Sequence, residues 1–89
     1  MYVHLGEDVE VRDKEIIGIF NIEDMPVKNS TRDFLINAER DSLITYVSDN
    51  LPKSMIICTE NIGESIYLSN ISSNTIFERT IDKNKLFSD

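Results

Sequence analysis

The chain has 89 residues, 16 of them acidic and nine basic, for a formal net charge of −7. A chain of this size forms one domain around one small core, and its 40% hydrophobic and 28% charged content is typical of a folded protein. No apolar run approaches the ~18 residues of a membrane span, and the first ten residues lack the basic segment of a signal peptide. The single cysteine, Cys58, cannot form an internal disulfide. These features predict a small acidic protein in a reducing, intracellular setting.

The first quarter of the sequence favours strands. Isoleucine occurs 13 times, and β-branched side chains suit pleated surfaces. Alternation over Tyr2–Leu5 and Val9–Val11, separated by Gly6-Glu7-Asp8, predicts a short hairpin. Glu15–Ile22 is a strongly apolar strand, in which Gly18 indicates a bulge or a close approach by another backbone.

A helix is expected next, over about Thr31–Asp41. Ser30 is the expected N-cap, with Asp33 in the acidic third position of a capping box. Phe34, Leu35 and Ala38 follow the spacing of one apolar helix face.

The second half of the chain predicts three more strands and a short helix. The strands are expected at Ser42–Val47, Lys53–Thr59 and Ser65–Ser69, with a helix from about Ser73 to Arg79. Residues 1–81 then form a single domain, and 82–89 form a polar C-terminal tail.

This element order predicts an α+β fold. We expect a small curled antiparallel sheet, similar to a half-barrel, with one main helix and a short C-terminal helix. The apolar runs Ile16–Phe20 and Met55–Cys58 need burial on both faces, which one helix cannot supply. Either the sheet curls on itself, or a second subunit covers the other face.

No motif for catalysis, a cofactor or a metal is present. His4 is the only histidine, and it could pair with Cys58 as base and nucleophile. However, Cys58 lies in an apolar run, where cysteine behaves as a small hydrophobic residue, and a histidine is more often packed or hydrogen-bonded. The three glycines do not form a phosphate-binding loop. We therefore expect no enzyme.

The charge distribution bears on possible partners. An acidic chain repels phosphate backbones overall, although a local basic face acts within a Debye length of ~8–10 Å. Lys14, Arg40 and Lys53 either belong to an ordinary solvated surface or share such a face. The aromatic residues are not interleaved with basic residues as in a base-stacking platform.

Several segments resemble a known family. The opening Met1-Tyr2-Val3-His4-Leu5-Gly6, the Lys14-Glu15-Ile16-Ile17-Gly18-Ile19-Phe20 strand, Leu51-Pro52-Lys53-Ser54 and the Ser69–Thr75 loop are similar to the RemA/RemB family of bacterial biofilm-matrix regulators, closest to the RemB type. The resemblance covers about Met1 to Arg79.

The resemblance implies a cytoplasmic, non-enzymatic transcriptional regulator of extracellular-matrix genes. It implies a ring of identical subunits that bind DNA through basic residues around the outside. One such position falls on Lys14, and the others fall in the turn Asn50–Lys53, where Lys53 alone is basic. Lysine keeps the phosphate contact but loses the bidentate fork of arginine.

Two functional hypotheses follow. The first is a DNA-binding oligomeric regulator that contacts phosphates through Lys14 and Lys53, with Arg12 and Arg40 as further candidates. The second is an oligomeric protein-interaction module that modulates such regulation, through a partner regulator protein, without binding DNA.

Overall fold

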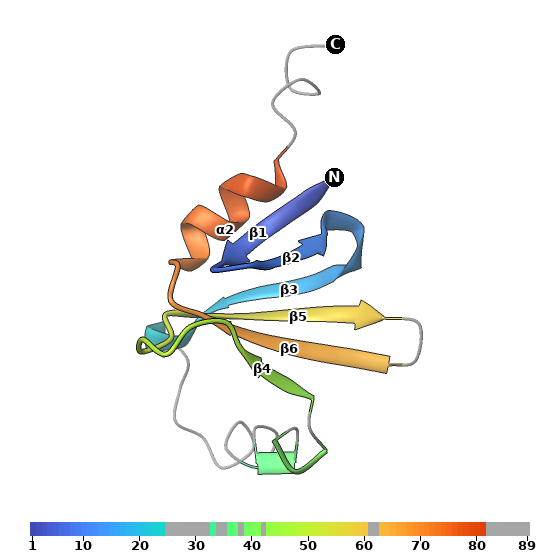
Figure 1. Cartoon of the computed structure of the whole chain (residues 1–89), viewed down its shortest axis with the longest axis vertical. Coiled ribbons are helices and arrows are strands. Elements are labelled where there is room, and N and C mark those ends of the chain that lie inside the picture. Colours follow the sequence, from blue (N-terminus) through green and yellow to red (C-terminus); the bar gives the residue numbers. More distant parts are fainter. Residues whose placement is uncertain (25–32, 34–35, 38, 42, 61–62, 82–89) are drawn as a thin grey trace.

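A computed structural model describes residues 1–24, 33, 36–37, 39–41, 43–60 and 63–81 of the chain (Figure 1). In chain order, the elements are β1 (Tyr2–Gly6), β2 (Val9–Arg12), the 3₁₀ turn η1 (Asp13–Glu15), β3 (Ile16–Asn21), the 3₁₀ turn η2 (Ile22–Asp24), β4 (Ile44–Tyr46), β5 (Ser54–Glu60), β6 (Gly63–Ser69) and α2 (Ser73–Thr80). The expected tail, residues 82–89, lies outside the described residues.

The N-terminal hairpin is confirmed. β1 pairs with β2 in antiparallel fashion, and the turn carries a positive φ of 121° at Gly6 and 47° at Glu7. Gly6 is required here for a second reason, because a Cβ would lie 3.1 Å from Cγ1 of Val47. The His4 Nε2–H donates to the Glu7 carbonyl at 2.7 Å and ties the turn to β1.

The larger sheet has the strand order β3-β5-β6-β4. The bulge predicted at Gly18 is confirmed, because the β3–β5 register shifts between Ile16 and Gly18. The group that approaches Gly18 is the ring of Phe20 in the same strand, whose Cε2 would lie 2.6 Å from an added Cβ. No second backbone is needed to explain this glycine.

Two features of the expected single antiparallel sheet are wrong. The hairpin β1–β2 forms a separate two-stranded sheet, so the described strands build two sheets rather than one. In addition, β4 runs parallel to β6, with Ile44 opposite Ile66. The chain reverses direction between β4 and β5, as expected. However, β4 and β5 do not pair with each other, because β6 lies between them.

The main core lies between the two sheets and α2. Side chains from β1, β2, β5 and α2 meet there, and the most deeply buried are Leu5, Ile56, Cys58 and Ile76, each with no exposed surface. Figure 1 shows α2 alongside the hairpin. The apolar alternation of β1 thus places Val3 and Leu5 inward and His4 outward.

Among the described residues, the helix that packs on this core is α2, through Ile76, and the described part of 31–41 contributes no residue to it. Asp33, 36–37 and 39–40 are helical, and the Asp41 N–H donates to the Asn37 carbonyl at 3.0 Å. These residues lie at the end of the molecule away from α2 (Figure 1). Ser30, Phe34, Leu35 and Ala38, on which the expected cap and apolar face depended, lie outside the described residues.

The opposite face of the larger sheet carries a second apolar cluster. Met55 and Ile66 are buried there, with Ile22, Ile44, Ile57 and Leu68 partly buried around them. Phe20 of β3 remains 42% exposed. As the apolar runs predicted, the central strand β5 therefore presents apolar residues to both faces, and described residues cover the second face incompletely.

Two buried serines connect separate segments of the fold. The Ser69 hydroxyl donates to the Leu5 carbonyl at 2.6 Å, and the Ser54 hydroxyl donates to the Ile71 carbonyl at 2.8 Å. Both serines are 0% exposed and face each other across the β5–β6 pair. Each supplies a hydrogen bond to a backbone group that the sheet ladder cannot reach.

Candidate functional site

A polar groove of about 250 Å³ lies where β3, β5 and α2 meet. We call it the Lys53 groove, and it is lined by Asn21, Glu23, Lys53, Ser72, Ser73 and Asn74. The lining side chains combine one cation, one carboxylate, two amides and two hydroxyls. Such a set can hydrogen-bond a polyanion or the polar edge of a base.

The position of Lys53 is fixed by its backbone. Its N–H donates to the Ser69 carbonyl at 2.7 Å, and its carbonyl accepts from the Ile22 N–H at 3.0 Å. Lys53 therefore joins β6 to η2, while its side chain is exposed. No described carboxylate forms an ion pair with its ammonium group.

The beginning of α2 forms one wall of the Lys53 groove. The Ser72 hydroxyl caps this helix by accepting from the Thr75 N–H at 3.3 Å. The helix expected from about Ser73 to Arg79 is confirmed, and its cap is Ser72. Because the amino end of a helix carries partial positive charge, this wall adds to the field of Lys53.

A short turn beside the groove presents an exposed leucine. Leu51 is 88% exposed, the most exposed of the large hydrophobic side chains in the described chain. The turn is tied at both ends, because the Val47 N–H donates to the Leu68 carbonyl at 2.9 Å and Lys53 makes the bonds described above. Within it, the Asn50 N–H donates to the Ser48 hydroxyl at 3.1 Å.

Arg12 and Lys14 form a separate basic pair at the end of β2. Both side chains are exposed, on either side of Asp13, whose carboxylate lies 3.5 Å from the amino group of Met1. The Arg12 guanidinium lies over the Tyr2 ring, 6.0 Å from its centroid. The Tyr2 side chain, and after it the Glu15 carboxylate, raise the pKa of Arg12, so this cation stays charged.

The described chain does not bring the four candidate residues together. Lys14 precedes β3, whereas Lys53 bonds to the residue that follows β3, so the length of the strand separates them, about 20 Å at ~3.3 Å per residue. Arg40 lies in the helical segment at the far end of the molecule (Figure 1). The four residues therefore form three locations: Arg12 with Lys14, Lys53, and Arg40.

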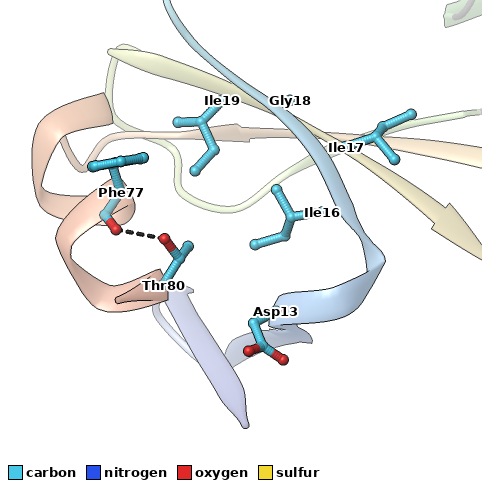
Figure 2. A pocket seen from close by; sticks show the side chains of 7 residues that line it. All are labelled: Asp13, Ile16, Ile17, Gly18, Ile19, Phe77 and Thr80. Atoms are coloured by element: carbon cyan, nitrogen blue, oxygen red, sulfur yellow. Dashed lines mark hydrogen bonds between the residues drawn. The ribbon is translucent and has the colours of Figure 1, made fainter. Parts of the chain in front are cut away.

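A second, apolar groove of about 340 Å³ runs between β3 and α2 (Figure 2). In Figure 2, Ile16 and Ile19 of β3 lie on the side of Phe77 and Thr80, and Ile17, which also lines the groove, points away from α2. Ile17 is 56% exposed and Phe77 is 57% exposed. The Thr80 hydroxyl donates to the Phe77 carbonyl at 2.6 Å (Figure 2), so its hydrogen is already used within α2. We call this surface the β3–α2 groove.

The remaining candidates for chemistry do not converge. Cys58 is buried in the core, while the ring of His4 is on the outer side of β1, so the two do not face one another. Among the described residues there is no cluster of three or more metal-binding side chains. No helix in the described ranges is long and apolar enough to cross a membrane.

The described chain is thus a small α+β protein with two sheets and two exposed grooves. The family model described as "RemA-like: Extracellular matrix regulatory protein A-like" matches residues 2–80. The chain is also 32% identical, over 79 residues, to "Extracellular matrix regulatory protein B" of Bacillus subtilis (strain 168), with 89% of each chain covered. The chain therefore belongs to the RemA-like family of extracellular matrix regulatory proteins, and the resemblance to the RemB type is confirmed.

Sequence reasoning missed most of the Lys53 groove. Asn21, Glu23 and Asn74 are distant in sequence from Lys53, and only the β3–β5 pairing and the placement of α2 bring them together. No periodicity or spacing carries that information. The exposure of Leu51 could have been suspected from its place between Asn50 and Pro52 in a turn, where a side chain has few neighbours.

Proposed function

We propose that this chain is a cytoplasmic, oligomeric DNA-binding regulator of extracellular-matrix genes. The observation that carries the proposal is the Lys53 groove, in which a cation unpaired with any described carboxylate lies beside hydroxyl and amide groups and a helix amino end. These groups are the usual partners of DNA phosphates. The family to which the chain belongs is one of regulators, which agrees with this assignment.

The net charge of −7 limits how DNA can approach. Most of the surface repels a duplex, so binding must be confined to the basic locations, where short-range contacts exceed the screened repulsion. Lys53 and the pair Arg12 and Lys14 lie at opposite ends of β3. This spacing is better suited to two separate contacts along the DNA backbone than to one concentrated phosphate-binding site.

Self-association would strengthen these contacts. The β3–α2 groove leaves Ile17 and Phe77 exposed, and β3 is an edge strand of the larger sheet. We propose that a second copy of the chain covers this surface, because an apolar groove next to an open strand edge is suited to protein contact. In a closed ring, each weak phosphate contact is repeated once per subunit, so the overall affinity rises without new contacts.

The β3–α2 groove also supports the second candidate function. An apolar docking surface on an acidic chain could hold a partner regulator protein instead of a second copy. The chain would then modulate regulation without touching DNA.

The experiment that separates the two functions is a DNA-binding titration that compares the wild-type protein with a variant of the Lys53 groove. We expect the wild-type protein to bind fluorescently labelled duplexes, and Lys53→Ala to weaken this binding. Arg79→Gln serves as the control, because it also removes one positive charge, and Arg79 donates to the His4 carbonyl rather than lining the groove. Absence of binding by the folded wild-type protein would favour the protein-interaction function.

A further inference from the structure

We infer that Leu51, with Pro52, is an apolar wedge that enters the minor groove of DNA. Lys53, Asn50 and Asn74 would contact the edges of the base pairs in the minor groove beside the wedge. The inference rests on the proposed DNA-binding function and specifies which groove is read and how. It differs from a contact to phosphates alone, because it predicts deformation of the duplex.

The first step in the argument is the exposure of Leu51. An isolated exposed leucine is ordinary on a protein surface. Leu51, however, is 88% exposed on a turn whose ends are both fixed by backbone hydrogen bonds to β6. Pro52 restricts the backbone further. The side chain is therefore held away from the protein on a rigid support, which lowers the entropic cost of inserting it into a partner.

The second step is the chemistry around Leu51. Asn50 and Lys53 are exposed and lie in the same turn. Lys53 and Asn74 line the adjoining Lys53 groove of the protein. Proteins that bind the minor groove combine lysine and asparagine, which read its acceptors, with apolar wedges such as leucine and proline. A protein-docking hot spot would instead favour aromatic residues and arginine around the leucine, and the groove contains neither.

The third step concerns the electrostatic potential of the DNA minor groove. The minor groove of A·T-rich DNA is narrow and carries an enhanced negative potential, which attracts a single lysine more strongly than a wide groove does. One cation at the wedge therefore has a larger effect here than elsewhere on the duplex. The wedge itself needs a flexible step such as TA, at which unstacking is least costly.

The test measures bending and groove preference separately from binding. A duplex with a central TA step in an A·T-rich sequence carries a donor and an acceptor dye at its ends, and energy transfer reports the end-to-end distance. We expect wild-type protein to shorten this distance, Leu51→Met to retain the effect, and Leu51→Ala to abolish it with about a tenfold loss of affinity. Tyr46→Ala is the matched control, because it removes a 60% exposed side chain from β4 and leaves the turn intact.

Groove preference is tested by replacing A·T pairs with inosine·cytosine pairs. This exchange preserves the pattern of the A·T minor groove and changes the major groove, so we expect affinity to be retained. Because Leu51 is exposed, both of its variants should keep the urea midpoint of the wild type. Binding without bending, equal affinity of Leu51→Ala and wild type, or loss of affinity on inosine·cytosine DNA would overturn the wedge and leave the DNA-binding function standing. No binding to any duplex would overturn both.

Discussion

Ser69 in β6 and Leu5 in β1 are joined by the hydrogen bond that ties the N-terminal hairpin to the larger sheet. The Ser69 hydroxyl donates to the Leu5 carbonyl at 2.6 Å, and its oxygen accepts from the Ile71 N–H at 3.0 Å. The residues are 64 positions apart in the chain and are both fully buried. The same side chain thus connects the hairpin, β6 and the segment that leads into α2.

We expect Ser69→Ala to lower the free energy of unfolding by about 1–3 kcal/mol. The substitution leaves a buried carbonyl and a backbone N–H without their partner, and unsatisfied buried groups carry a penalty of that size. Urea unfolding measures the change. Ser48→Ala is the control, because its hydroxyl accepts an exposed hydrogen bond and its loss should cost under about 0.5 kcal/mol. Equal losses for both variants would contradict the connecting role of Ser69.

A second prediction concerns the cap of α2. Ser72→Ala removes the side chain that accepts from the Thr75 N–H, and it should destabilise the protein by about 1 kcal/mol. Ser73→Ala, in the first helical position, makes no cap contact and should be nearly neutral. Thermal unfolding followed by circular dichroism compares the two. The reverse order of stability would place the start of the helix one residue later.

A third prediction concerns self-association. Phe77→Ser replaces an exposed wall of the β3–α2 groove with a small polar side chain, so it should lower the oligomer mass and leave the secondary structure unchanged. Light scattering after size-exclusion chromatography measures the mass. Tyr46→Ser removes a similarly exposed aromatic side chain from β4 and should keep the wild-type mass. If Tyr46→Ser dissociates the oligomer and Phe77→Ser does not, the subunit contact lies on the β4 side of the sheet.

A fourth prediction concerns the acidic residue in the Lys53 groove. Glu23→Gln removes a carboxylate that would repel a phosphate and keeps a side chain of the same size. We expect DNA affinity to rise by roughly 1.4- to fivefold, the range that corresponds to a solvent-exposed charge interaction of about 0.2–1 kcal/mol. Glu10→Gln on β2 removes the same charge outside the groove and should change affinity less. Equal effects would indicate that net charge, and not the groove, controls binding.

The local features of the fold follow from the sequence, while the long-range ones do not. Alternation placed Val3 and Leu5 in the core, and Gly18 marked the bulge in β3. Nothing local to β4 shows that β6 inserts between it and β5, because strand order depends on pairing energies summed over the whole sheet. The separate two-stranded sheet was missed for the same reason.

The residues that carried the family resemblance also illustrate this limit. Ser54 and Ser69 stood in segments similar to the family, yet their role is to hydrogen-bond backbone groups in distant segments. A serine hydroxyl can cap, turn or bridge, and only its surroundings decide among these roles. Likewise, Lys14 and Lys53 look alike in sequence, but they lie at opposite ends of β3.

The central claim is that the chain binds DNA through the Lys53 groove despite its acidity. Fluorescence anisotropy of a long A·T-rich duplex, titrated with the intact oligomer across a salt series, tests it most directly. We predict saturable binding whose logarithm falls linearly with the logarithm of salt concentration, and a shallower slope for Lys53→Ala by about one for each lysine that contacts a phosphate. No binding at low salt, or a slope that Lys53→Ala leaves unchanged, would contradict the account.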